Sequence, residues 1–457
     1  MLGRCLLSAA LVVAQALMVR AAPPMPHDPR AAPIVPSQDP FYAVPDNVGS
    51  SPPGTILRHR APPSEIAAFG LAPVRLAATH QLQYRTNDNL GNATATVLTV
   101  LVPHHADMRK VLSYQVAEDA AAIDCAPSYG LQLESATGPL LGTVLTQAEM
   151  LLIEAALEQG WVVVVPDFEG PRASYLAHRL AGQATLDGIR AALRSGDITG
   201  IESDATVSMW GYSGGSMATA WAAEIQPTYA PELRIAGAAI GGTTPNITNV
   251  VTTINKSAFT GLIATGIMGL STQFPALKAE VDRLLKPAYR DKFEQVYHQC
   301  LLANAASFLF SDVVDMFTDT RFVYDNPVAV EVLDEVSLGH AVPQIPIYWY
   351  KSVHDEVSPV EDSDDLYDKY CAEGSGATVE YVRDEASEHG SMAVTGAPRA
   401  IAWLEKVMSG RQPRPGCSRE TVLSSLWDIS TIEVVPGFIL DALLDLIGKP
   451  VGPILFG

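Results

Sequence analysis

The chain has 457 residues, of which 48% are hydrophobic, so it is long enough to bury a large core without external stabilisation. Its formal net charge of −20 at pH 7 disfavours nucleic acid as a partner, because phosphates would be repelled. The same charge disfavours simple electrostatic attachment to an anionic membrane. The length suits one large domain with insertions or two domains.

The N-terminus has the pattern of a secretory leader. Arg4 precedes an apolar run over residues 5–19, and small residues follow that offer cleavage sites. A membrane anchor is the alternative, but the run is short and prolines follow it at once. We therefore predict a signal peptide over residues 1–21 and a secreted protein. Residues 22–54 are rich in proline and are predicted to form an irregular N-terminal arm over the surface.

The cysteines fit an oxidising compartment. Removal of the leader leaves Cys125, Cys300, Cys371 and Cys417, an even number that predicts two disulfides with three alternative connectivities. No C-x-x-C or H-E-x-x-H motif is present, so we expect neither a metal site nor a cofactor. Three sequons, at Asn92, Asn246 and Asn255, predict glycosylation on exposed loops.

Strands and helices alternate through residues 55–244, the first part of the predicted core. The continuous apolar run at 161–165 is typical of a strand buried on both faces of a sheet. The alternation predicts an α/β fold with a mostly parallel sheet flanked by helices. The predicted strands are 81–86, 94–102, 110–116, 161–165, 206–210 and 234–240, and the predicted helices are 147–159 and 185–193.

The strand at 206–210 ends in Gly211-Tyr212-Ser213-Gly214-Gly215, and an alanine-rich helix follows. Glycines two residues before and after a serine allow a sharp strand-to-helix turn that exposes the serine oxygen. The unpaired N–H groups of the helix start, led by that of Gly214, can stabilise a developing negative charge. The stretch thus has the pattern of a nucleophile elbow with Ser213 as nucleophile, although a serine in an ordinary glycine-rich turn is the alternative.

The alternation stops over residues 245–337, where helix-like and locally uncharged sequence predicts an inserted cap or lid. Its run at 258–274 is shorter than a membrane span and contains three glycines, so we do not expect it to cross a membrane. Such an apolar insertion after the elbow can line an acyl-binding tunnel or open as a lid at a lipid surface. Additional core packing is the alternative.

The α/β pattern resumes over residues 338–410, the second part of the predicted core, with strands at 345–350 and 378–383 and helices at 362–372 and 391–408. Residues 411–457 form the C-terminal tail, loop-like over 411–436. An apolar helix face follows at 438–447. This face either docks on its own domain or acts as a flap over the site entrance.

A serine nucleophile needs a base and an orienting acid, which follow it in this fold in the order Ser, acid, His. His389 is the histidine after Ser213 that lies just past a predicted strand and before a helix. Asp355, on the loop after strand 345–350, is the natural acid, and the neighbouring Glu356 is the alternative. We predict His354 to be a rim or packing residue.

The oxyanion formed on an ester needs two donors. The Gly214 N–H is the first. The loop after strand 110–116 is expected to supply the second, which makes the backbone N–H of Asp119 the candidate. Glu118 and Asp119 could equally be two solvated loop acids.

At this point the chain resembles the secreted fungal lipase family typified by yeast lipase A, over about residues 39–417. The lid is the least similar part, and Val353-His354 departs from the proline-containing approach to the acid that the family often has. The resemblance implies a Ser213, Asp355 and His389 triad, an oxyanion hole of Asp119 and Gly214, and disulfides Cys125–Cys300 and Cys371–Cys417. It rests on these segments: Gln83-Tyr84-Arg85-Thr86, Ser113-Tyr114-Gln115-Val116, Asp124-Cys125-Ala126-Pro127, Gly211-Tyr212-Ser213-Gly214-Gly215, Asp355-Glu356-Val357 and Glu388-His389.

We therefore predict a secreted carboxylic-ester hydrolase of the α/β-hydrolase fold, most simply a triacylglycerol lipase that acts on a lipid or ester substrate through an acyl-enzyme. The alternatives are an esterase for short-chain or acylated secondary-metabolite esters, a serine peptidase on the same fold, and a non-catalytic binding protein.

Overall fold

The computed structural model describes residues 33–68, 72–135, 144–427 and 449–453. The predicted signal peptide and the apolar helix face at 438–447 lie outside the described residues. The described part of the N-terminal arm contains three short 3-10 helices, η1 (Pro36–Gln38), η2 (Pro40–Tyr42) and η3 (Val48–Ser50).

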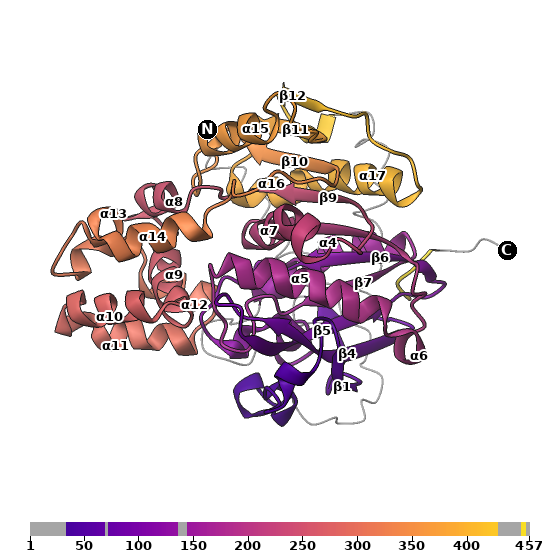
Figure 1. Ribbon diagram of the computed structural model, residues 1–457, viewed down its shortest axis with the longest axis horizontal. Helices are drawn as coiled ribbons and strands as arrows, with labels where there is room; N and C mark the ends of the chain where they lie inside the picture. Colours follow the sequence, from indigo (N-terminus) through magenta and orange to yellow (C-terminus); the bar gives the residue numbers. More distant parts are fainter. Residues whose placement is uncertain (1–32, 69–71, 136–143, 428–448, 454–457) are drawn as a thin grey trace, which may run out of the picture. The chain divides into compact units, whose positions relative to one another are not determined.

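A ten-stranded sheet forms the centre of the described chain, and its strands run in the order β1-β4-β5-β7-β6-β8-β9-β10-β11-β12 (Figure 1). Neighbouring strands are antiparallel from β1 to β7 and parallel from β7 to β12. The predicted α/β-hydrolase fold with a mostly parallel sheet is thereby confirmed. The strands are β1 (Ile56–Arg60), β4 (Ala78–Asn87), β5 (Ala93–Val102), β6 (Asp107–Gln115), β7 (Trp161–Pro166), β8 (Thr206–Tyr212), β9 (Ile235–Gly241), β10 (Ile347–Ser352), β11 (Val379–Asp384) and β12 (Cys417–Val422).

Helices cover both faces of this sheet. On one face lie α5 (His178–Leu193), α7 (Gly214–Tyr229) and α15 (Val360–Tyr370), which share a buried cluster with the strands. On the other lie α4 (Met150–Glu158) and α17 (Ala397–Met408), which form a second cluster. Small residues let these layers approach closely, because a Cβ at Gly182 of α5 would lie 3.0 Å from the backbone of α7. Burial on both faces explains why the central strands are continuously apolar.

Shorter elements complete the described chain. They include a two-stranded sheet beside the main one and the helix that begins at the predicted catalytic histidine. These elements are β2 (Ala67–Ala68), β3 (Ala72–Pro73), η4 (Ile123–Cys125), α2 (Pro127–Gly130), α3 (Val144–Ala148), α6 (Gly196–Thr199), α16 (His389–Thr395) and η9 (Ser425–Trp427).

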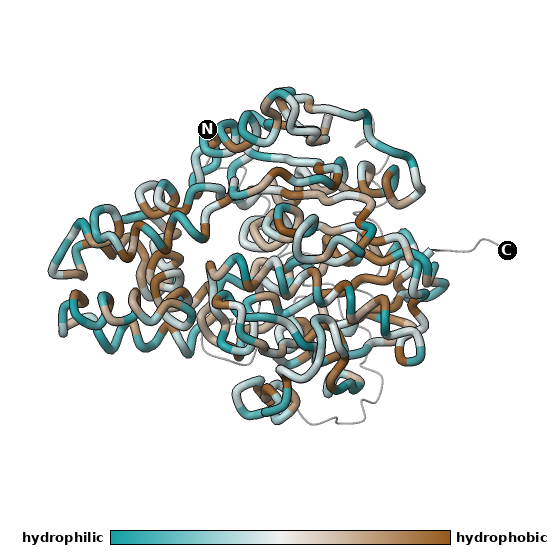
Figure 2. Tube along the Cα trace, viewed as in Figure 1, coloured by the Kyte–Doolittle hydropathy of each residue, from teal (hydrophilic) through white to brown (hydrophobic). Residues whose placement is uncertain are grey.

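The segment predicted as a lid is helical from end to end and has a hydrophobic cluster of its own. Figure 2 shows hydrophobic residues along its inner helices and hydrophilic ones on its outer turns. Its apolar run contains an 11-residue helix, and within the described ranges no helix is long and apolar enough to cross a membrane. The lid elements are α8 (Ile247–Ile254), α9 (Gly261–Ser271), α10 (Pro275–Leu284), η6 (Pro287–Tyr289), α11 (Arg290–Glu294), η7 (Gln295–His298), α12 (Leu301–Ser307), η8 (Val314–Met316), α13 (Phe322–Asp325) and α14 (Pro327–Val336).

Two disulfides are formed, with the pairing that the resemblance implies. Cys125–Cys300 joins the loop region after β6 to the lid. Cys371–Cys417 joins the end of α15 to the start of β12. The second one marks a difference from the sequence interpretation, because residues 417–422 were expected to be loop and instead extend the sheet as its edge strand. The residues of β12 are mostly exposed, so the strand carries no hydrophobic alternation that could have predicted it.

The three sequon asparagines differ in their surroundings. Asn92 is exposed on the turn between β4 and β5. Asn246 is half-buried and its side chain caps α8 by accepting a hydrogen bond from the backbone of Asn249. The half-buried Asn255 donates to Asp312 and accepts from a backbone N–H. A glycan is accommodated most easily on Asn92.

Candidate active site

The turn between β8 and α7 has the geometry of a nucleophile elbow. Ser213 adopts φ 51° and ψ −122°, a strained conformation for a residue with a side chain, and remains partly exposed. Both outer glycines are required by close backbone contacts. A Cβ at Gly211 would lie 2.2 Å from the Gly215 carbonyl oxygen, and one at Gly215 would lie 1.9 Å from the Gln115 carbonyl oxygen. The sequence pattern therefore reflects steric necessity at this turn.

The side chain of His389 reaches this serine from a distant part of the chain. Its Nε2 lies 2.9 Å from the Ser213 Oγ. The backbone of His389 is held at both groups, because its N–H donates to Glu356 at 2.7 Å and its carbonyl accepts from the Tyr212 hydroxyl. A capping box formed by Glu388 and Ser391 starts α16 at this point. The imidazole is therefore fixed against a hydroxyl that it can deprotonate.

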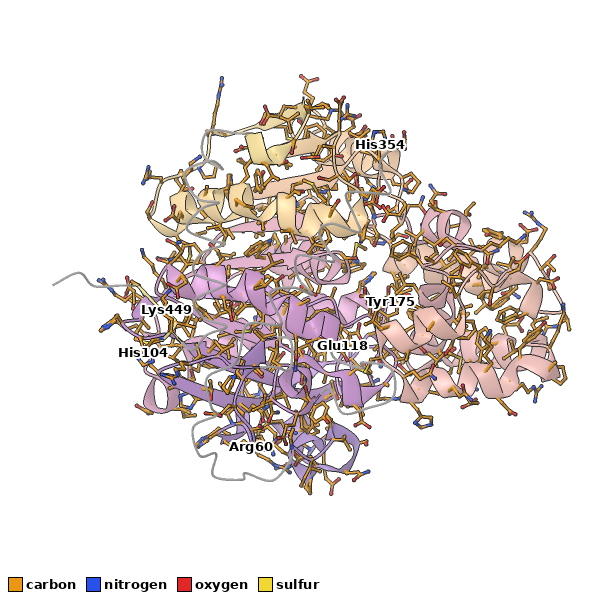
Figure 3. The ribbon with its side chains drawn as sticks, turned by 180° about the vertical axis from the view of Figure 1, so that it is seen from behind. Arg60, His104, Glu118, Tyr175, His354 and Lys449 are labelled. Atoms are coloured by element: carbon orange, nitrogen blue, oxygen red, sulfur yellow. A yellow bond between two sulfur atoms is a disulfide. The ribbon has the colours of Figure 1, made fainter. Side chains whose placement is uncertain are left out.

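Asp355 lies on the other side of the imidazole. Its Oδ2 is 2.8 Å from the His389 Nδ1, and its Oδ1 accepts backbone N–H groups of Val357 and Ser358 at 2.9 Å each. Glu356, the alternative acid, is exposed and contacts the backbone of His389 in place of its ring. The structure therefore brings together the three side chains that the sequence singled out, Ser213, His389 and Asp355. His354 is exposed beside them (Figure 3).

The sequence interpretation missed Lys351. This residue lies in the interior of β10, and its side chain is fully buried. Its Nζ donates to the Asp355 Oδ2 at 2.8 Å and to the Thr243 carbonyl at 2.9 Å. Burial alone would raise the pKa of Asp355, but the charges and hydrogen bonds of His389 and Lys351 hold that pKa well below its ordinary value. A charged residue inside an otherwise apolar strand, four positions before the acid, was the available signal.

The predicted oxyanion residues lie next to each other. Asp119 has φ 46°, and a Cβ on Gly214 would lie 1.9 Å from its Oδ1, so glycine is needed where α7 begins. Within the described chain this Oδ1 has no hydrogen-bond partner. Burial raises the pKa of Asp119 to about 7, although the charge of His389 opposes the shift. The two residues thus line one side of the space beside Ser213.

The two acids of this loop, Glu118 and Asp119, are both buried, so the alternative that they are solvated loop residues is wrong. Burial raises the pKa of Glu169 well above its ordinary value, and the backbone N–H groups of Ala120 and Asp119 oppose that shift in part. Tyr175 lies near Glu118, on the side toward the lid (Figure 3). The oxyanion loop therefore rests on buried carboxyl groups.

An apolar pocket extends from Ser213 into the lid. It is enclosed mostly by aliphatic side chains from α7, α8, α9 and α14, and the polar residues that reach it cluster at its Ser213 end. Its lining includes Asp119, Ser213, Gly214, Met217, Ile247, Val251, Ile263, Ile267, Leu270, Leu277, Phe322, Ala329, Val332, Leu333 and Val357. Such a surface favours a hydrocarbon chain over a peptide or a sugar.

Comparisons with known proteins agree with this site. The model of the secretory lipase family matches residues 135–416. Lipase A of Arthroderma benhamiae is 48% identical over 424 residues, which covers 92% of this chain and 90% of that protein. The chain belongs to the secretory lipase family. This lipase is also 36% identical to Lipase 2 of Candida albicans, over 91% of its own length and 90% of the relative's.

Solved structures give the same result. The lipase superposes on the closed state of Candida antarctica lipase A with a TM-score of 0.80 and 30% identity, which covers 93% of this chain and all of the other. Family and fold together make this protein a serine ester hydrolase. A hydrolase from Legionella pneumophila, at 14% identity and a TM-score of 0.60, shares the fold alone.

Proposed function

We propose that Ser213, His389 and Asp355 form the catalytic triad of this lipase. The Ser213 Oγ attacks the ester carbonyl while the His389 Nε2 takes its proton and then returns it to the leaving alcohol. Water, activated by the same imidazole, then cleaves the acyl-enzyme. Asp355 holds the imidazole in the required tautomer. The observation that carries this proposal is the continuous contact from the Ser213 Oγ through the imidazole to the Asp355 Oδ2.

Two donors stabilise the oxyanion in this proposal, the backbone N–H groups of Gly214 and Asp119. Gly214 is the first residue of α7, so its N–H has no partner within the helix and lies at the positive end of the helix dipole. Asp119 adjoins it from the loop after β6. Loss of one such donor costs about 3 to 4 kcal/mol of transition-state stabilisation in comparable sites.

We propose a triacylglycerol as the substrate, with one acyl chain in the lid pocket. The pocket begins at Ser213 and its walls are aliphatic, which suits a long hydrocarbon chain. The similar lipase A of Candida antarctica has been solved in a closed state. By analogy the lid segment 245–337 covers the site here and moves when substrate enters.

Secretion follows from the predicted leader and is supported by the family's description as secretory. The disulfides Cys125–Cys300 and Cys371–Cys417 fit an oxidising compartment. Of the sequons, we propose Asn92 as the principal glycosylation site because its side chain is exposed.

The test is a chain-length series of triglycerides and soluble esters, measured on the wild type and on Ser213→Ala. The proposal requires activity on emulsified long-chain triglyceride, labelling of Ser213 by a serine-directed phosphonate, and loss of activity by at least 10³-fold in the variant. Turnover confined to soluble short-chain esters would assign an esterase. Retained activity in Ser213→Ala would refute the triad.

A further inference from the structure

The buried ammonium of Lys351 is an unusual neighbour for a catalytic carboxylate. Lysine is almost never fully buried unless its charge is paired. Here the side chain is inaccessible to solvent, and the Asp355 carboxylate supplies its charge partner at 2.8 Å. The Thr243 carbonyl accepts a second hydrogen bond. The lysine is therefore held in one place relative to the proposed triad.

Lys351 and His389 contact the same oxygen atom. The Asp355 Oδ2 lies 2.8 Å from the lysine Nζ and 2.8 Å from the imidazole Nδ1. The two nitrogens are therefore within about 6 Å of each other, a separation at which two positive charges repel appreciably in a buried site. Protonation of the imidazole places a second cation on a carboxylate that already has one.

We propose that Lys351 is a positioning residue for the ester hydrolysis, which keeps Asp355 charged and fixed and opposes protonation of His389, so that the enzyme retains its neutral base in mildly acidic solution. This inference rests on the proposed function of the triad. It assigns the lysine no contact with substrate. The ammonium acts through the carboxylate and through its charge.

The other titratable groups around the pair act in the opposite direction. Asp119 faces His389 from the loop after β6, and Glu356 contacts its backbone from the loop after β10. Asp362 of α15 faces Lys351, and Tyr212 of β8 lies against the imidazole. Each is an anion when ionised and therefore favours a protonated imidazole. Lys351 offsets them.

The experiment compares the pH dependence of kcat/KM on a soluble short-chain ester for the wild type, Lys351→Met and Lys351→Arg. Removal of the charge in Lys351→Met should move the acid limb to higher pH by about 1 unit or more, which is a tenfold loss of relative activity for each unit on that limb. Lys351→Arg keeps the charge, so its acid limb should stay near that of the wild type even where kcat falls.

A purely structural role would lower kcat at every pH without moving the limb. The neighbouring Ser352→Ala is the control for that effect, because it removes a buried hydrogen bond to the His389 loop and changes no charge. If Lys351→Met does not fold, Lys351→Gln makes the same charge change with a polar side chain. An unmoved acid limb in a folded charge-removing variant would overturn the inference.

Failure of this inference is distinguishable from failure of the proposed function. Phosphonate labelling of Ser213 together with an unmoved limb would leave the triad intact and remove only the role of Lys351. Absence of labelling, or an active Ser213→Ala, would remove the triad itself.

Discussion

The hydroxyl of Tyr212 donates a hydrogen bond to the backbone carbonyl of His389. Tyr212 is the last residue of β8 and immediately precedes the serine, so this bond joins the nucleophile turn directly to the loop that carries the imidazole. Both residues are buried. The distance between serine and imidazole is therefore fixed by a contact that involves neither reacting group.

Tyr212→Phe should lower kcat by about tenfold and leave KM nearly unchanged. The variant leaves a buried carbonyl without its donor, which costs about 1 to 3 kcal/mol and loosens the imidazole. No charge is altered, so the acid limb of the pH profile should not move. Steady-state kinetics on a soluble ester, with thermal unfolding as a control for stability, measures this. An unchanged kcat would show that other contacts suffice to hold His389.

The sequence predicted the elbow and the triad because each has a local steric or topological signature. Glycines at 211 and 215 are forced by backbone contacts, and the acid and the base each follow a recognisable strand. Lys351 and the burial of Glu118 were not predictable in this way, since both depend on which distant segments pack over them. Strand β12 was missed because its residues are mostly exposed and a disulfide anchors its first residue. The cysteine spacing alone left three pairings open.

Substitutions of Asp119 test which of its groups serves the oxyanion. Asp119→Gly keeps the backbone N–H and suits the positive φ, so kcat should stay within about tenfold of the wild type if the N–H is the donor. Asp119→Asn is the matched control, because asparagine tolerates the same backbone conformation and preserves the side-chain shape. A fall of 10² to 10³ in Asp119→Gly, with activity retained in Asp119→Asn, would assign the role to the side chain.

Glu149 should make the protein less stable as pH rises from about 4.5 to 8. Burial raises the pKa of Glu149 to about 8, against the hydrogen bonds from Tyr114 and from the Ala117 N–H. A carboxyl with a raised pKa in the folded state binds its proton more tightly there than in the unfolded chain. Its stabilising contribution is therefore complete below the unfolded pKa and is lost as pH rises through the folded one, at up to about 1.4 kcal/mol per pH unit.

Glu149→Gln should accordingly flatten the decline of melting temperature between pH 5 and pH 8. Glutamine has nearly the same shape and cannot ionise. Glu405→Gln, at an exposed position of α17, is the matched control and should leave the decline as it is in the wild type. Calorimetry at several pH values measures both. An equally steep decline in Glu149→Gln would assign the pH dependence to the other buried acids, of which Asp167 also has a pKa raised by burial to about 7.

Adjacent residues of α14 test the acyl pocket. Ala329 is buried and lines the pocket, whereas Val330, the next residue, is 42% exposed. Ala329→Phe places a ring in the space proposed for the acyl chain, and Val330→Phe adds the same ring on the solvent side. We expect Ala329→Phe to lower kcat/KM for C16 and C18 esters by at least tenfold relative to C4 esters, because a long chain must displace the ring or leave apolar carbons in water. Val330→Phe should leave that ratio unchanged. Equal losses on short and long esters in Ala329→Phe would mean that the chain lies elsewhere, since a substitution that only destabilises the lid reduces activity on every chain length alike.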